Sequence, residues 1–164
     1  MTRLLRWLCC ALLLCALTAH AQYMVKPWSA NQAMPAVELV DMAGKTVRLA
    51  DYKGKTVVLN FWATWCEPCR SEMPSLAQLQ EVAGPDLIVL AANFKEGSAK
   101  IEQFGKTSGI QMNWLRDPEG LAAKAFDVRI FPSTLIIGAT GKPLRKIIGE
   151  VDWTGKDAEQ LLKP

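Results

Sequence analysis

The segment TVVLNFWATWCEPCR, residues 56–70, decides how the rest of the chain is interpreted. Its first part, Thr56 to Phe61, is a β-branched and apolar run that predicts a buried strand. A short link then places Cys66 at the start of a helical pattern, where unpaired backbone N–H groups and the helix dipole lower the pKa of a thiol. Cys69 follows within one turn. The segment therefore predicts a strand, a turn and a helix that carry a dithiol suited to disulfide exchange.

The first 21 residues have the features of a secretory signal peptide. Arg3 and Arg6 form a basic region, residues 8–17 form an apolar region, and Ala19-His20-Ala21 forms a small-x-small cleavage site. We therefore expect a periplasmic or otherwise exported protein that is cleaved after Ala21. A signal that is retained and anchors the chain in the membrane is the alternative.

Removal of residues 1–21 would leave 143 of the 164 residues, the size of one domain with a sizeable core. The net charge would fall from +3 to +1, which gives no electrostatic reason to expect nucleic acid as a partner. Three of the five cysteines and the only histidine would leave as well, so Cys66 and Cys69 would be the remaining thiols. We therefore expect no histidine-based catalysis, no metal site and no other cofactor.

Strand and helix patterns alternate along the rest of the chain and predict an α/β fold. Residues 22–34 have no clear period and are interpreted as a leader segment to a domain over residues 35–164. Strands are expected at residues 36–40 and 46–49, which form a hairpin, and at residues 87–92, 112–115, 134–138 and 144–148. Helices are expected at residues 70–83, 99–108, 119–126 and 154–162, the first with a kink at Pro74.

Two motifs together resemble the active-site sequences of thioredoxin-fold oxidoreductases. They are Trp65-Cys66-Glu67-Pro68-Cys69 after a buried strand and the later Phe131-Pro132-Ser133-Thr134 segment before another strand. The chain is similar to the exported TlpA/ResA/DsbE-like branch over residues 34–162. This resemblance implies a thioredoxin-like three-layer α/β/α sandwich with an N-terminal β-hairpin and a central insertion.

The resemblance also implies roles for the cysteines and for the Pro132 segment. Cys66 would be the exposed attacking thiol and Cys69 the more buried resolving thiol, and the two would form a redox-active disulfide. Pro132 would be a cis-proline that faces the dithiol and exposes the backbone of Phe131 to substrate; a trans-proline at the start of a strand is the alternative. Phe131 would shape the choice of partner, or serve only as hydrophobic cover.

Glu72 lies three residues after Cys69 and shares a helix face with it. By resemblance Glu72 takes part in thiol proton transfer, since a buried carboxylate with a raised pKa can accept the Cys69 proton. The alternative is a solvated glutamate in the first helical turn. Thioredoxins proper carry a buried aspartate where this chain has Asn60, and an amide cannot take up that proton.

The residues around the cysteines are expected to tune the dithiol. Trp65 would cover the disulfide, and Glu67 and Pro68 fill the dipeptide between the cysteines. An anionic Glu67 beside Cys66 disfavours its thiolate, and a less stabilised thiolate makes the couple more reducing. We therefore expect an enzyme, a protein thiol–disulfide oxidoreductase, that acts mainly as a reductant.

The expected substrates are protein disulfides, with cytochrome c maturation as one setting. The expected electron source is a membrane dithiol donor, and the protein is expected to be a monomer. Two other functions stay open. A peroxiredoxin-like peroxidase shares the fold, although the closely spaced cysteine pair argues against it. A non-enzymatic copper-binding module would use Cys66, Cys69 and the nearby Met73.

Overall fold

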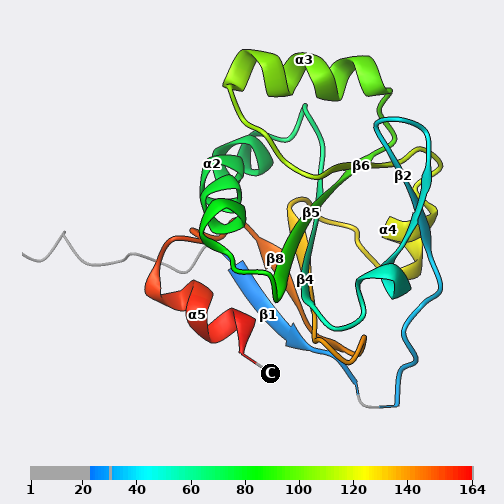
Figure 1. Cartoon of the computed structure of the whole chain (residues 1–164), viewed down its shortest axis with the longest axis vertical. Coiled ribbons are helices and arrows are strands. Elements are labelled where there is room, and N and C mark those ends of the chain that lie inside the picture. Colours follow the sequence, from blue (N-terminus) through cyan, green and yellow to red (C-terminus); the bar gives the residue numbers. More distant parts are fainter. Residues whose placement is uncertain (1–22, 30, 164) are drawn as a thin grey trace, which may run out of the picture.

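The computed structural model describes residues 23–29 and 31–163 (Figure 1). The signal peptide expected at residues 1–21 lies outside these described residues. Within the part that the structure describes, no helix combines the length and the apolar character needed to cross a membrane.

The described residues form a mixed sheet of eight strands in the order β1-β8-β7-β4-β5-β6-β2-β3. Its central strand β4 pairs parallel with β5 and antiparallel with β7. The strands are β1 (Tyr23–Pro27), β2 (Glu38–Asp41), β3 (Thr46–Arg48), β4 (Thr56–Trp62), β5 (Leu87–Phe94), β6 (Trp114–Asp117), β7 (Ser133–Ile137) and β8 (Pro143–Gly149).

Helices cover both faces of the sheet, as a three-layer sandwich requires. They are α2 (Glu67–Val82), α3 (Ser98–Ser108), α4 (Leu121–Ala125) and α5 (Lys156–Leu162), with a short 3-10 helix η1 (Leu49–Tyr52). Figure 1 shows α2 and α5 on one side of the strands and α4 on the other. Along the chain, α3 and β6 follow β5 and precede α4.

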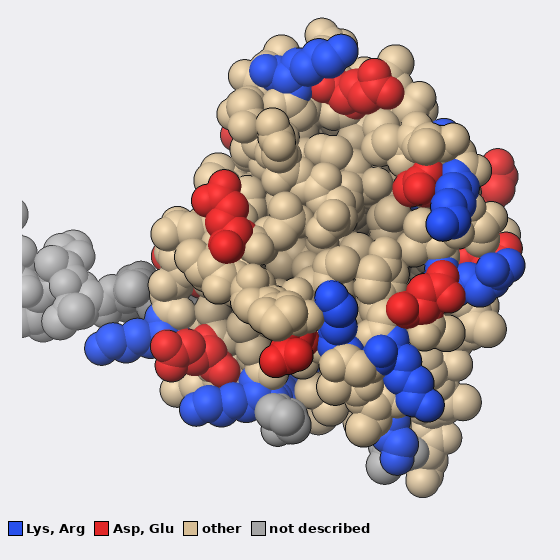
Figure 2. Space-filling model, in the orientation of Figure 1, with Lys and Arg blue, Asp and Glu red and all other residues tan. Residues whose placement is uncertain are grey.

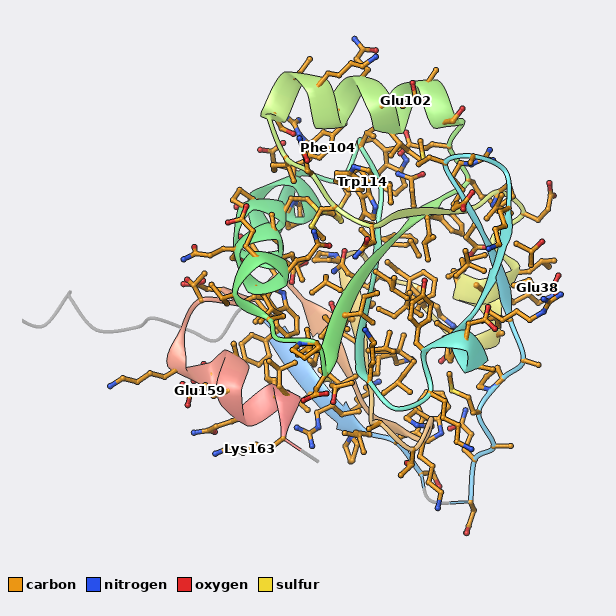
Figure 3. The ribbon with its side chains drawn as sticks, in the orientation of Figure 1. Glu38, Glu102, Phe104, Trp114, Glu159 and Lys163 are labelled. Carbon is orange, nitrogen blue, oxygen red and sulfur yellow. A yellow bond between two sulfur atoms is a disulfide. The ribbon has the colours of Figure 1, made fainter. Side chains whose placement is uncertain are left out.

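The alternating side chains of β4 explain why the domain has two cores. Val58 and Trp62 point to the face that packs against α2, α3 and α5, whereas Leu59 and Phe61 point to the face that packs against α4. Trp62 packs against Phe104 of α3 and Trp114 of β6, with ring centroids 5.0 and 5.1 Å away, and these last two are labelled in Figure 3. A strand buried on both faces has a nearly continuous apolar sequence, and this run is why β4 could be predicted from the sequence.

Most of the expected elements are present, with shifts at their ends. The predicted hairpin forms from β2 and β3, and the predicted buried strands β4 and β5 pair with each other in parallel. β6 begins two residues later than predicted because Trp114 N–H turns back to the Met112 carbonyl at 2.9 Å. α5 begins at Lys156 without a side-chain cap, since its N-cap residue is Gly155, which has no side chain to accept from the helix N–H groups.

The prediction that residues 22–34 form only a leader segment is wrong for Tyr23–Pro27. This stretch is β1, an edge strand that pairs antiparallel with β8 along its whole length. Four of its five side chains are exposed, so the strand is held by backbone pairing and carries no hydrophobic period. The side chains of β1 therefore show no pattern from which the strand could be predicted.

Gly120, just before α4, supports the loop that follows β5, and its replacement tests this contact. Its φ is +71°, and a Cβ there would lie 2.5 Å from Lys95 Cε and 2.7 Å from Phe94 Cε2. Gly109 has a φ of +70° with nothing within 4 Å of a Cβ, which makes it a matched control. Gly109→Ala should cost roughly 1–2 kcal/mol for the left-handed backbone. Gly120→Ala should cost clearly more, because Phe94 must also move; equal losses in the urea-measured free energy of unfolding would contradict this.

Candidate active site

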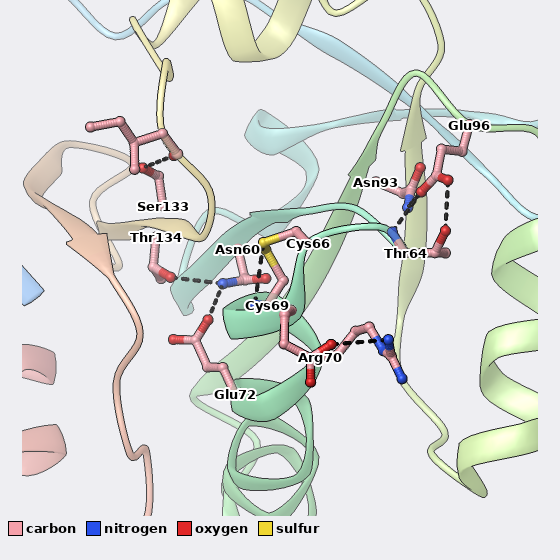
Figure 4. The surroundings of a disulfide bond; sticks show 12 residues. Asn60, Thr64, Cys66, Cys69, Arg70, Glu72, Asn93, Glu96, Ser133 and Thr134 are labelled. Carbon is pink, nitrogen blue, oxygen red and sulfur yellow. Dashed lines mark hydrogen bonds and ion pairs between the residues drawn. A yellow bond between two sulfur atoms is a disulfide. The ribbon is translucent and has the colours of Figure 1, made fainter. Parts of the chain in front are cut away.

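Both cysteines lie at the start of α2 and form a disulfide (Figure 4). The S–S distance is 2.08 Å and the Cα–Cα distance is 5.3 Å. Cys66 is the N-cap residue, and the backbone N–H of Cys69 donates to Cys66 Sγ at 3.3 Å. A thiolate at Cys66 would therefore meet a backbone donor and the positive end of the helix, both of which favour its charge.

The prediction that Cys66 is exposed is wrong, although Cys66 is more accessible than Cys69 as predicted. Cys66 is 6% exposed and Cys69 is 0% exposed, so Cys66 is the more accessible of two buried residues. Part of their cover is aromatic, since Phe131 packs against the core cluster that contains both cysteines. Access to Cys66 thus depends on the residues above it.

That cover consists of three aromatic rings from three segments. Trp65 is 64% exposed and meets Phe131 edge-on at a centroid distance of 5.9 Å. Phe131 also packs against Phe94 at the end of β5, at 5.0 Å. The Phe131–Pro132 peptide bond is cis, as expected, and Pro132 is buried. The rings join the cysteine segment, the Pro132 loop and the β5 end into one surface.

Glu67 and Pro68 fill the first turn of α2. Proline fits there because the first N–H groups of a helix have no intrahelical partner. The Glu67 carboxylate forms an exposed ion pair with Arg70 at 3.0 Å, which offsets part of its negative charge near Cys66. This pair could have been predicted from the sequence, because residues three apart on a helix lie on the same face.

Glu72 is buried beneath the cysteine turn, at 1% exposure, and is not the solvated residue of the alternative interpretation. Its Oε1 accepts hydrogen bonds from Trp153 Nε1 at 2.7 Å and from the Val151 backbone N–H at 3.2 Å. Its Oε2 accepts from Asn60 Nδ2 at 3.1 Å. Burial raises the pKa of Glu72 to about 8, although these hydrogen bonds oppose the shift.

Asn60 connects Glu72 to the strand that follows Pro132. It lies opposite Thr134 in the antiparallel pairing of β4 and β7, and its Nδ2 donates to Thr134 Oγ1 at 3.0 Å. Figure 4 shows the Asn60 amide between the Glu72 carboxylate and the disulfide. Sequence reasoning missed Thr134 and Trp153 as partners in this network, because no local pattern links residues so far apart.

A second buried carboxylate, Glu96, fixes the link that precedes Cys66. It accepts hydrogen bonds from the Thr64 N–H and hydroxyl, each at 2.7 Å, and from Asn93 Nδ2 at 2.9 Å. Burial by itself would raise the pKa of Glu96, but these bonds and nearby Lys100 hold it below its usual value. Glu96 therefore stays ionised and ties the β5–α3 loop to the cysteine segment. No local sequence pattern links Glu96 to Thr64, so this contact could not be predicted.

The chain is similar to known proteins that exchange thiols and disulfides. A family model described as AhpC/TSA matches residues 30–144. The chain is 34% identical over 132 residues to the thiol-disulfide oxidoreductase ResA of Bacillus subtilis (strain 168), an alignment that covers 79% of the chain and 74% of ResA.

Two solved structures show the same architecture. A thiol:disulfide interchange protein of the thioredoxin family from Chlorobium tepidum TLS has a TM-score of 0.66 at 28% identity, with 79% of this chain and 94% of that one covered. The exposed lipoprotein thioredoxin of Streptococcus pneumoniae strain TIGR4 has a TM-score of 0.62 at 32% identity, with 77% and 96% covered. The expected thioredoxin-like α/β fold is confirmed.

The raised pKa of Glu72 predicts a pH-dependent stability. In the folded chain this pKa is about 8, above the ordinary value of 4.5, so between these values the folded chain holds a proton that the unfolded chain has released. Stability then falls as pH rises through this window, by on the order of a few kcal/mol. Glu72→Gln should remove this dependence in urea unfolding of the oxidised protein from pH 5 to 9.

Glu67→Gln is the matched control for that experiment. It makes the same chemical change on the same helix, but the Glu67 side chain faces solvent, so the slope of stability against pH should stay as in wild type. Parallel curves for wild type and Glu72→Gln would show that Glu72 does not carry the effect.

Proposed function

The chain belongs to the AhpC/TSA family and is a thiol–disulfide oxidoreductase, and from this premise we propose that it reduces protein disulfides outside the cytoplasm. The observation that carries the proposal is the Cys66–Cys69 pair at the start of α2, with a buried Glu72 one turn below. This arrangement supplies a nucleophile, a resolving thiol and a proton acceptor on one helix.

The reaction divides into two thiol–disulfide exchanges. The Cys66 thiolate attacks one sulfur of a substrate disulfide, the other substrate sulfur leaves as a thiolate, and a mixed disulfide forms. Glu72 then accepts the Cys69 proton, and the Cys69 thiolate attacks Cys66 Sγ. The second substrate sulfur leaves, both substrate thiolates take protons from water, and two electrons have passed to the substrate. The enzyme ends with its own disulfide.

The surroundings of the dithiol favour the reducing direction. Glu67 places a negative charge beside Cys66, which its ion pair with Arg70 offsets only in part. Negative charge near a thiolate raises its energy, which makes the dithiol a better electron donor and the disulfide the favoured product. Trp65 and Phe131 would present the substrate with an aromatic surface, while the Pro132 loop offers its backbone.

Location, clients and electron supply form the finer part of the proposal. The features of residues 1–21 support export, and the Streptococcus pneumoniae relative is described as an exposed lipoprotein. The likeness to the TlpA/ResA/DsbE branch makes cytochrome c maturation the setting in which to search for clients. A membrane dithiol donor would regenerate the enzyme, which we propose acts as a monomer.

Figure 2 shows acidic and basic side chains interspersed around the edge of one face, whose centre is largely uncharged.

The mechanism predicts that Cys69→Ser traps substrate. Without the resolving thiol, the mixed disulfide at Cys66 should accumulate with a disulfide-containing protein such as insulin and be seen by mass spectrometry. Cys66→Ser should trap none, since the remaining thiol is fully buried. Both variants should lose insulin reduction. Failure of Cys69→Ser to form any mixed disulfide would contradict the exchange mechanism.

The same variants distinguish disulfide reduction from peroxide reduction, the alternative that the match to the AhpC/TSA family model makes worth testing. A peroxidase that depends on a single cysteine would still consume hydrogen peroxide as Cys69→Ser. We expect peroxide consumption by this variant to be no faster than that of Cys66→Ser.

A further inference from the structure

Asn60 has a buried polar atom that no neighbour satisfies. Among the described residues, four buried side-chain nitrogen or oxygen atoms lack a hydrogen-bond partner, and two of them are acceptors: Asn60 Oδ1 and Asn93 Oδ1. Leaving such a group unpaired costs roughly 1–3 kcal/mol, so it calls for a structural explanation. Asn60 is in direct contact with Glu72, the group to which the proposed function assigns a proton.

The partners of Glu72 suit only one of its two charge states. Trp153, Val151 and Asn60 all donate to its carboxylate, and each of these bonds fits the ionised form. A protonated Glu72 carries an O–H group that must donate to an acceptor. Asn60, which contacts Glu72 through Nδ2, carries an acceptor without a partner, Oδ1, at the other end of the same amide.

Rotation of the Asn60 amide by half a turn would satisfy the protonated state. Oδ1 would then occupy the present position of Nδ2, within reach of both Glu72 Oε2 and Thr134 Oγ1. The Glu72 O–H and the Thr134 hydroxyl can both donate to it, since a hydroxyl serves as donor or acceptor. Nδ2 would move to the side on which Figure 4 shows the cysteines.

We propose that Asn60 is a positioning residue whose amide turns over with each proton that Glu72 gains or loses during dithiol–disulfide exchange. While Glu72 is ionised and Cys69 is a thiol, Oδ1 faces the cysteine turn, where an acceptor suits S–H. When the proton has moved to Glu72, Nδ2 faces that turn, where a donor suits the Cys69 thiolate. This inference rests on the proposed function and adds to it a device that stabilises both ends of the proton transfer.

The groups around Glu72 keep the test simple. Besides the neutral partners already named, Glu150 is the charged residue that acts on it, and its negative charge helps to raise the pKa of Glu72. In the oxidised protein Cys66 and Cys69 are joined and do not titrate. Glu72 is therefore the group to which a response of Asn60 near pH 8 can be assigned.

The experiment is an NMR titration of the oxidised full-length chain from pH 6 to 10, with the Glu72 carboxyl carbon and the asparagine side-chain amides as probes. The Asn60 amide signals should shift with the same midpoint as Glu72. Cross-peaks between the Nδ2 protons and Thr134 should be present at high pH and lost at low pH. In Glu72→Gln, whose amide imitates the protonated acid, Asn60 should show its low-pH signals throughout.

Asn93 is the matched internal control. It is also buried, its Nδ2 donates to a glutamate and its Oδ1 lacks a partner, but that glutamate, Glu96, has a lowered pKa and stays ionised. Its signals should stay constant over the same range.

Three results would overturn the switch. They are Asn60 signals that do not change while Glu72 titrates, equal changes at Asn93, and a Glu72 that does not titrate between pH 6 and 10. Because the titration needs no substrate, its failure would leave insulin reduction intact, whereas failure of the proposed function would appear in the Cys69→Ser trapping experiment.

Discussion

The burial of one carboxyl group, Glu72, is the constraint on which the active site depends. A carboxyl group that is removed from water needs hydrogen bonds within the protein. The groups that donate to Glu72 belong to β4 and to the segment that leads from β8 to α5. The helix that carries the cysteines is thereby fixed to the sheet and to the C-terminal part of the chain at the same point. The start of α2, with its dithiol, and the Glu72 carboxyl group are consequently held in place by a single group of contacts.

Two buried glutamates flank the cysteine segment, and their environments give them different tasks. Glu96 receives bonds from Thr64 and Asn93 and has Lys100 nearby, so its charge is permanent and its role is mechanical. Glu72 has neutral donors and the repulsive Glu150, so its charge can be exchanged near neutral pH. The same type of side chain thus holds a loop in place at one position and, in the proposed mechanism, accepts a proton at the other.

The sequence predicted best what is encoded by neighbouring residues. The buried strand β4, the helix start at Cys66 and the hairpin of β2 and β3 were identified because their periods and turn residues are local. The edge strand β1 was missed because backbone pairing needs no pattern of side chains. Trp153 and Thr134 could not be found as partners of the site, since only the folded sheet and the packing of α2 bring them to Glu72 and Asn60.

The hydrogen bond between the Trp153 indole and Glu72, 2.7 Å long, has a spectroscopic consequence. A carboxylate at the edge of an indole exerts an electric field on the ring, and the field disappears when the carboxyl group is neutralised. The energy of the indole excited state responds to such a field. The protein therefore carries, within its own core, a chromophore whose light absorption and emission depend on whether Glu72 is protonated.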